Sequence, residues 1–242
     1  MEDFDLELDE KGWFGLSDKN LINKNAALII IDMENFAVKR EWGIVGTESS
    51  GTSIDEGKDY YYGRIENIVI PNLQKILAFY RRNKLNIIHI RLASLYRNWD
   101  DVPKLWRIQL KKMQRESKSE KKYDVYYKSE AVQFINELKP LEEEIEVIKN
   151  TGNSWTSTNL DFILKNKGIN SLIVGGVWGN SCLEDTVRIG ADLGYLITLL
   201  EDAVCSPDER FHDSAIRVLR ALYCDVRNTN EVINLLQERL KV

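Results

Sequence analysis

An unbroken apolar run at residues 26–31, Ala-Ala-Leu-Ile-Ile-Ile, ends at the acidic residue Asp32. A run with no polar residue alternating through it is typical of a parallel strand that is covered on both faces. Similar runs recur along the chain, and they predict strands at about 26–32, 86–92, 145–149, 170–176, 195–200 and 223–228. The intervals predict helices at about 64–83, 103–115, 129–138, 157–167, 182–193, 208–222 and 230–240.

This alternation of strands and helices constrains the fold class. It predicts an α/β fold, in which right-handed crossovers build a parallel sheet and place helices on both of its faces. A chain of 242 residues can bury one large core, so we expect a single domain over residues 1–242. Within it, we interpret residues 1–23 as an N-terminal extension and residues 93–128 as an insertion or lid segment.

Three reactive side chains stand at or just beyond the ends of predicted strands. Asp32 ends the first strand, Lys149 ends the third, and Cys182 follows the fourth after a glycine-rich bend. In open α/β sheets, ligands bind outside the carboxyl ends of the strands. An acid that takes a thiol proton, a lysine that stabilises negative charge and a thiolate that attacks would form one coherent catalytic constellation.

Cys182 lies on the predicted first turn of a helix, directly after Gly175-Gly-Val-Trp-Gly-Asn-Ser181. The partial positive charge and free N–H groups of a helix N-terminus favour a thiolate and can hold an oxyanion. The alternative interpretation is a packed thiol, because free cysteine is among the most buried residue types. The presence of Asp32 and Lys149 at the other strand ends favours the nucleophile.

These segments resemble motifs of the isochorismatase-like superfamily of cysteine hydrolases, which includes nicotinamidases, carbamoyl-amide hydrolases and ureidoacrylate amidohydrolases. Asp32-Met-Glu-Asn resembles the D-M-Q-N motif of the first strand, with Glu34 in place of the usual glutamine. The segment from Lys149 through Ser154-Trp155 to Leu160 is similar to K-x(4)-S-[aromatic]-x-x-T-x-L. The resemblance covers roughly residues 24 to 225, in three ordered motifs.

The third motif contains the cysteine. Residues Gly176-Val177 to Cys182 are similar to G-V-x-T-x-x-C, except that Gly179 stands where a threonine is common. The resemblance implies a three-layer, doubly wound, six-stranded parallel sheet of isochorismatase-like fold, with strand order 3-2-1-4-5-6. That order places the switch point between the first and fourth strands, where Asp32 and Cys182 would meet. Lys149, on the edge strand, must then reach inward over the second strand.

The resemblance also implies a chemistry, which is hydrolysis of the C–N bond of a small amide or carbamoyl compound through a thioester. Asp32, Lys149 and Cys182 would be the catalytic residues, with Asp32 accepting the thiol proton. The backbone N–H groups of Trp178 and Cys182 would form the oxyanion hole, in a loop with a cis peptide at Val177–Trp178. Neither a cofactor nor a metal is expected, because the chain has only two histidines, His89 and His212.

Aromatic side chains are frequent near these motifs, which favours a pocket for a small, flat, partly apolar substrate. Arg97 is the candidate for binding a substrate carboxylate. The candidate pocket residues are Phe36, Trp42, Arg97, Trp155, Val177 and Trp178.

Composition excludes some classes of function. The net charge of −5 argues against a nucleic-acid partner, for which a basic face is expected. No apolar run approaches the roughly 20 residues of a membrane span. Three cysteines do not make a disulfide framework, and the acidic N-terminus differs from the basic start of a signal peptide, so we expect a cytoplasmic protein.

The segment 93–128 is basic, yet Leu105, Trp106, Ile108, Leu110 and Met113 recur in it at helical spacing. We interpret it as an amphipathic helix that forms a lid or a subunit contact. RNA binding is the less favoured alternative, because the aromatic residues are expected to face the core. Family members are commonly oligomeric, and the apolar stripe would otherwise be exposed, so a homo-oligomer (a dimer or a tetramer) is expected.

Three other functions remain open. Isochorismatase-type hydrolysis of a vinyl ether is one, although enzymes of that type generally lack the cysteine. A binding or regulatory protein that keeps the fold without turnover is another, which the departures at Glu34 and Gly179 leave possible. The third is a redox-sensing thiol pairing Cys182 with Cys205 or Cys224, for which no Cys-x-x-Cys motif is present.

Overall fold

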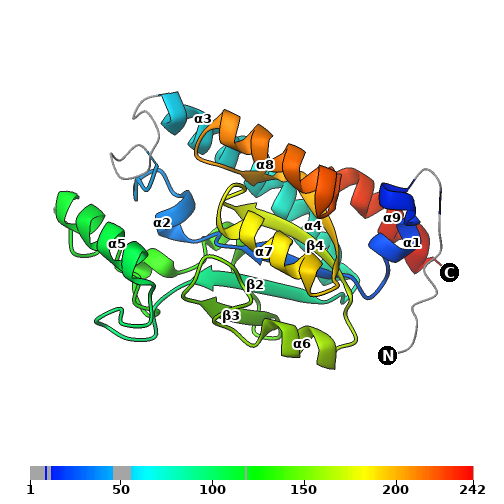
Figure 1. The fold of residues 1–242 in the computed structure, drawn as a ribbon, viewed down its shortest axis with the longest axis horizontal. Coiled ribbons are helices and arrows are strands. Elements are labelled where there is room, and N and C mark those ends of the chain that lie inside the picture. The colour runs from blue at the N-terminus through cyan, green and yellow to red at the C-terminus, as the bar shows by residue number, and fades with distance from the viewer. Residues whose placement is uncertain (1–8, 10–11, 46–55, 118, 242) are drawn as a thin grey trace.

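A six-stranded, wholly parallel sheet forms the centre of the protein, as the computed structural model shows for residues 9, 12–45, 56–117 and 119–241 (Figure 1). The strand order is β3-β2-β1-β4-β5-β6, as predicted. The strands are β1 (Ala27–Ile31), β2 (Ile87–Leu92), β3 (Ile145–Lys149), β4 (Ser171–Val177), β5 (Leu196–Cys205) and β6 (Asp225–Arg227).

Helices cover both faces of the sheet, and β1 shows why its sequence is apolar throughout. Leu28 and Ile30 point into one hydrophobic cluster, whereas Ala27, Ile29 and Ile31 point into the other. The first face is covered by α1 (Asp18–Leu21), α3 (Glu56–Arg64), α4 (Ile70–Arg82) and α9 (Thr229–Leu240). The second is covered by α6 (Leu160–Asn166), α7 (Cys182–Asp192) and α8 (Glu209–Leu222).

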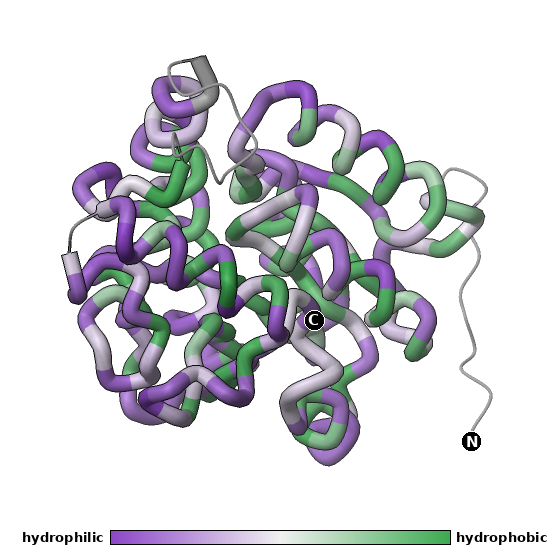
Figure 2. Tube along the Cα trace, turned by 60° about the vertical axis from the view of Figure 1, so that its left-hand side comes forward, coloured by the Kyte–Doolittle hydropathy of each residue, from purple (hydrophilic) through white to green (hydrophobic). Residues whose placement is uncertain are grey.

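Hydropathy follows this layering. Along the outer coils of the chain, hydrophobic and hydrophilic residues alternate from turn to turn (Figure 2). In the centre of the sheet, β1 and β2 are buried along their whole lengths. In α8 the buried residues recur every three or four positions, at His212, Ala215, Ile216 and Leu219. That period is the one expected for a helix with a single buried face.

The first long helix is not regular. The sequence predicts a helix at 64–83, but the helical run begins earlier, at Glu56. In it, α3 leads through a π-helical turn at Ile65–Val69 into α4, which ends at Arg82. Pro71 stands in the first turn of α4 and lacks the N–H that an uninterrupted α-helix would use. A π-helical turn is rare and occurs mostly as a single-turn bulge inside an α-helix, as it does here.

Strand β5 is longer than predicted. The pairing of β4 with β5 shifts between Val174 and Gly176, which face Leu199 and Val204. The extra residues of β5 between these two pairs include Glu201 and Asp202. Because they are acidic, the apolar pattern ends before them, and the predicted strand ends at residue 200. Asp202 instead accepts hydrogen bonds from the backbone N–H and hydroxyl of Thr229 at the start of α9.

The predicted helix at 129–138 is wrong. The structure has two short 3-10 turns there, Glu130–Val132 and Asn136–Leu138, separated by extended residues. Phe134 forms an antiparallel bridge with Glu34, and the N–H of Ile135 donates to the carbonyl of Met33. These tertiary backbone bonds replace the hydrogen bonds that a helix would make.

The segment 93–128 carries α5 (Lys104–Glu116), which stands beside α2 (Asn35–Val38), apart from the body of the sheet (Figure 1). One face of α5 is buried, and the other exposes Leu105 and Ile108 with 65% and 54% of their surface accessible. Lys118, one of the basic residues of the segment 93–128, lies outside the described residues.

Only part of the predicted N-terminal extension 1–23 belongs to the described residues. Residues 1–8, 10 and 11 lie outside the described residues, and a 3-10 turn at Trp13–Gly15 precedes α1. Leu21 and Ile22 are fully buried in the first cluster, so this part of the chain packs onto the sheet. Among the helices in the described ranges, none combines the length and apolar character that crossing a bilayer requires.

The backbones of β1 and β4 approach closely at Gly176, so a substitution there tests this packing. The φ of Gly176 is +123°, and a Cβ added to it would lie 2.1 Å from the carbonyl oxygen of Ile31. We therefore expect Gly176→Ala to lower the free energy of unfolding by at least about 2 kcal/mol. Gly63→Ala is the control, because Gly63 lies in α3 with open space around it.

Thermal melts followed by circular dichroism measure both variants. Gly63→Ala should be neutral or stabilising by up to about 1 kcal/mol. If Gly176→Ala melts with the wild type, the β1–β4 packing described above is incorrect.

Candidate active site

Asp32, Lys149 and Cys182 meet at the carboxyl end of the sheet. Asp32 follows β1, Lys149 is the last residue of β3, and Cys182 is the first of α7. The Nζ of Lys149 lies 2.8 Å from Oδ2 of Asp32. Because β2 stands between β3 and β1, the Lys149 side chain reaches over the end of β2, as predicted from the strand order.

This ion pair is shielded from solvent. Lys149 is 0% exposed and Asp32 5% exposed, and Lys149 Nζ also donates to the carbonyl of Thr151 at 3.2 Å. Asp32 has a φ of 55°, in the left-handed region, which aspartate enters more readily than most residues. Its N–H donates to the carbonyl of Ile90 at 2.8 Å, which ties the turn after β1 to β2.

The loop between β4 and Cys182 is held by backbone hydrogen bonds. The Val177–Trp178 peptide bond is cis, as the resemblance implied. The N–H of Gly179 donates to the carbonyl of Cys205 at 2.9 Å. A Cβ at Gly179 would lie 2.8 Å from Oγ of Ser206, so this position has little room for the threonine that the resemblance led us to compare with it.

The side chain of Trp178 is anchored by a hydrogen bond to Tyr61. Its indole Nε1 donates to the hydroxyl of Tyr61 at 2.8 Å, and that hydroxyl donates to the carbonyl of Ala37, also at 2.8 Å. The ring of Tyr61 packs edge-on against that of Trp178. The indole is therefore held by α3, and Tyr61 in turn is tied to α2.

The loop after Lys149 is fastened to the start of α7. The hydroxyl of Thr186 donates to the carbonyl of Cys182 at 2.6 Å and lies 3.0 Å from Oγ of Ser154. Trp155 donates from Nε1 to the carbonyl of Thr186 at 2.8 Å and stacks on Tyr195. This network fixes the cysteine relative to the strand that carries the lysine.

Burial governs the electrostatics of the three groups. Burial raises the pKa of the Cys182 thiol to about 12, against the attraction of Lys149. Burial thus favours a protonated thiol at rest, whereas the helix N-terminus alone favours a thiolate. Burial also raises the pKa of Asp32, although the Lys149 charge opposes it. Burial is the largest influence on Lys149 and lowers its pKa, but the charges of Asp32, Cys182 and Glu34 and the hydrogen bond to Asp32 together outweigh burial and raise it.

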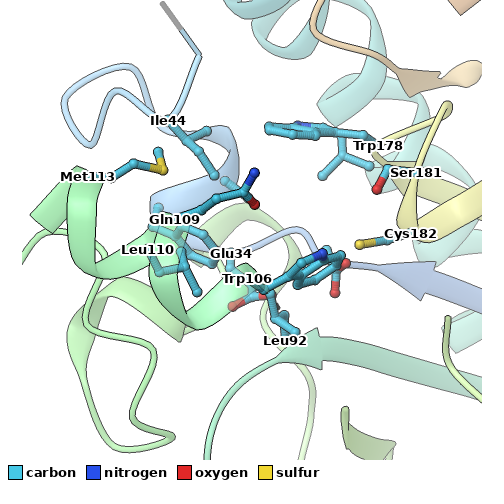
Figure 3. Close-up of a pocket in the computed structure, with 14 residues that line it drawn as sticks. Glu34, Ile44, Leu92, Trp106, Gln109, Leu110, Met113, Trp178, Ser181 and Cys182 are labelled. Carbon is cyan, nitrogen blue, oxygen red and sulfur yellow. Dashed lines mark hydrogen bonds between the residues drawn. The ribbon is translucent and has the colours of Figure 1, made fainter. Parts of the chain in front are cut away.

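A cavity of about 290 Å³ opens onto these groups. Cys182 and Ser181 lie on one side of it and the α5 residues on the other, with Trp178 and Ile44 between them at one end (Figure 3). The lining residues are Asp32, Glu34, Phe36, Ala37, Ile44, Leu92, Trp106, Gln109, Leu110, Met113, Val177, Trp178, Ser181 and Cys182.

Phe36, Val177 and Trp178 line this cavity, as expected from the sequence. Three other predicted pocket residues lie elsewhere, each for an identifiable reason. Trp42 packs against the core of the first sheet face. Trp155 is buried against α7 by the hydrogen bond and stacking described above.

Arg97 is the third of these residues. It is exposed, and its guanidinium lies 4.5 Å from the centre of the Tyr126 ring. Arg97 follows the second predicted strand closely in the sequence, but the sequence does not show in which direction the loop after that strand runs. Arg97 does not line the cavity.

The sequence led us to expect a lid or a subunit contact at residues 93–128, but none of its α5 residues was predicted to line the pocket. Trp106, Gln109, Leu110 and Met113 all line the cavity. The helical spacing of the apolar residues was a usable signal that one face would be buried. It could not show that this face would line the cavity, because periodicity does not specify the partner surface.

Among the described residues, no group of three or more histidine, cysteine, aspartate or glutamate side chains is arranged to hold a metal ion. His89 is buried in β2, with Nε2 2.8 Å from Oε2 of Glu144.

Comparison with known proteins matches the isochorismatase domain to residues 26–231. The ureidoacrylate amidohydrolase RutB of Caulobacter segnis is 26% identical over 202 residues, which are 79% of this chain and 77% of that protein. The uncharacterized isochorismatase family protein YddQ of Bacillus subtilis is 29% identical over 111 residues, 42% of this chain and 62% of that protein, less than two thirds of its length.

A solved structure agrees with the fold. The isochorismatase family protein from Desulfovibrio vulgaris aligns with a TM-score of 0.69 at 19% identity, over 88% of this chain and 98% of that one. The domain match extends from the residue before β1 into the first turn of α9, and it includes Asp32, Lys149 and Cys182. This chain therefore belongs to the isochorismatase family of hydrolases.

Proposed function

We propose that the protein hydrolyses the C–N bond of a small amide or carbamoyl compound through a thioester on Cys182. The observation that carries this proposal is the buried Lys149–Asp32 ion pair, which lies in hydrogen-bonding contact with the Cys182 thiol at a cavity. The amidohydrolase activity named for the Caulobacter segnis relative supports the same reaction class.

The first step transfers a proton while a bond forms. Because the pKa of Cys182 is raised to about 12, Asp32 takes the thiol proton as the sulfur attacks the carbonyl carbon of the substrate. The backbone N–H groups of Trp178 and Cys182 donate to the oxyanion in this proposal. Lys149 stays positive and offsets the negative charge of the site.

The later steps return the site to its starting state. The tetrahedral intermediate collapses as the C–N bond breaks, and Asp32 gives its proton to the departing nitrogen, which leaves as ammonia or an amine. Water then attacks the thioester with Asp32 accepting a proton. Cleavage of the C–S bond releases the carboxylic acid, or the carbamic acid from a carbamoyl substrate, and Cys182 recovers its thiol proton.

The alternatives receive less support from the geometry. All three cysteines are free, and Cys205 and Cys224 are both 0% exposed, so a redox pair has no visible thiol partner at the surface. A vinyl-ether hydrolase would leave the position of Cys182 unexplained. The homo-oligomer stays a prediction, with exposed Leu105 and Ile108 as its candidate contacts.

The lining of the cavity bears on the choice of substrate. Its walls are mainly apolar, and its described lining residues include the acids Asp32 and Glu34 but no lysine, arginine or histidine. Residues 46–55, which follow Ile44 in the chain, also contain no basic residue. A substrate carboxylate would meet no cation on these walls, so the site favours an uncharged amide with a compact apolar body.

Ammonia release from a panel of amides tests the reaction. The panel contains nicotinamide, ureidoacrylate, biuret, maleamate and N-carbamoyl amino acids. At least one should be hydrolysed, and Cys182→Ser should reduce kcat by more than about 10³-fold. Cys224→Ser is the matched control, because that thiol lies outside the cavity.

Iodoacetamide labelling gives a second readout of the same thiol. Cys182 is 9% exposed at the cavity and should be modified before the fully buried Cys205 and Cys224. Hydrolysis of none of the amides would contradict the proposed function. Near-normal turnover by Cys182→Ser would retain hydrolysis but exclude the thioester.

Asp32 and Cys182 should act as one unit. Because both belong to the same proton transfer, Asp32→Asn combined with Cys182→Ala should be little slower than Cys182→Ala alone. The kcat values of the two single variants and the double variant measure this coupling. Losses that multiply would instead show that Asp32 acts independently of the thiol.

Charge selection can be tested by adding a cation to the wall. We expect kcat/KM for nicotinamide to exceed that for anionic maleamate by at least about tenfold, because an unpaired buried carboxylate is costly. Gln109→Lys should raise the maleamate-to-nicotinamide ratio, whereas Gln114→Lys, on α5 but outside the cavity lining, should not. A wild-type preference for maleamate would contradict the uncharged substrate class.

A further inference from the structure

Glu34 is a second buried acid beside the catalytic pair. It follows β1 by three positions, lines the cavity and is 0% exposed. Its Oε1 accepts a hydrogen bond of 2.6 Å from the N–H of Leu92 at the end of β2. Its backbone is fixed by the antiparallel bridge to Phe134. The carboxyl group is therefore held in place from two sides.

One oxygen of Glu34 and one of Asp32 remain without a donor. Oε2 of Glu34 and Oδ1 of Asp32 are both buried, and neither accepts a hydrogen bond if both groups are ionised. Yet the two carboxyl groups lie within hydrogen-bonding contact of each other. Two ionised carboxylates offer only acceptors, whereas a single proton between them would give both oxygens a partner.

The surrounding charges are consistent with one proton on this pair. Lys149 supplies one positive charge, and it forms its ion pair with Asp32. Arg91 is held by Glu146 at 2.6 Å and by the carbonyls of Tyr127 and Val132. The thiol of Cys182 is neutral at rest. With both acids ionised, one buried ammonium would face two carboxylates.

We propose that Glu34 is a carboxylic acid in the active protein and donates its proton to Oδ1 of Asp32. It is then a positioning residue, which together with Lys149 fixes the Asp32 carboxylate for its contact with Cys182. The inference rests on the proposed function for its catalytic consequence. The protonation state itself does not depend on any substrate.

The electrostatics point the same way. Burial and the negative charge of Asp32 raise the pKa of Glu34 well above its usual value of 4.5. The Leu92 N–H and the charges of Lys149 and Arg91 oppose this rise but do not cancel it. Loss of the proton at high pH would turn a donor into a second negative charge and disturb the Asp32 carboxylate.

The pH dependence of stability tests the protonation state without a substrate. Because the folded pKa is raised, unfolded Glu34 loses its proton first as pH rises, so the contribution of Glu34 to stability falls from about pH 4.5 up to its folded pKa. Glu34→Gln cannot ionise, yet its amide N–H can donate to Asp32. Its Tm minus that of the wild type should therefore increase from pH 4 to pH 9.

Glu143→Gln is the control, because it makes the same chemical change at an exposed residue. Its Tm difference from the wild type should show no such increase. A difference for Glu34→Gln that stays constant or decreases with pH would overturn the proposal. Infrared spectra of the wild type provide a second measurement, and absence of a buried carboxylic acid band at pH 7 would also overturn it.

Kinetics with a substrate from the panel test the positioning role. Glu34→Ala removes the donor and should lower kcat by about tenfold or more with a smaller effect on KM. Glu34→Gln should rescue most of that loss and move the alkaline limb of the kcat profile to higher pH. If Glu34→Gln is as slow as Glu34→Ala, a carboxylate rather than a donor is needed, and the positioning role is wrong even though amide hydrolysis stands.

Discussion

The ion pair between Lys149 and Asp32 is the interaction on which the candidate site depends. An ammonium with no exposed surface is costly to bury, and its 2.8 Å contact with Asp32 offsets that cost. Buried pairs of this kind often add little net stability, so their value lies in the geometry they fix. Here the pair joins the ends of β3 and β1 across β2, and the strand order determines which side chains it can bring to Cys182.

Much of this arrangement could be predicted from short stretches of sequence. Continuous apolar runs identify strands that are buried on both faces. A reactive residue at the end of such a run is expected at the carboxyl edge of the sheet. The prediction was less reliable where tertiary contacts replaced local ones. Glu201 and Asp202 continue β5 because their polar groups find partners on other elements, and residues 129–138 exchange helical hydrogen bonds for contacts with the chain after β1.

The walls of the cavity were harder to predict than the reactive groups. A tryptophan beside a catalytic motif can pack into the core or face a ligand, and the sequence does not distinguish these outcomes. Trp178 lines the cavity, whereas Trp155 joins the loop after Lys149 to α7. Its hydrogen bond to Thr186 and its stacking on Tyr195 depend on residues more than 30 positions away along the chain.

The separate origin of the reactive groups and of the α5 wall has a consequence for how such a protein can diversify. Asp32, Lys149 and Cys182 are attached to the sheet and to the helix that follows it, whereas Trp106, Leu110 and Met113 come from a segment that stands apart from the sheet. Replacement of that segment would reshape the cavity while leaving the ion pair in place. The two parts can therefore evolve at different rates, with the sheet preserving one chemistry and α5 adapting it to new molecules.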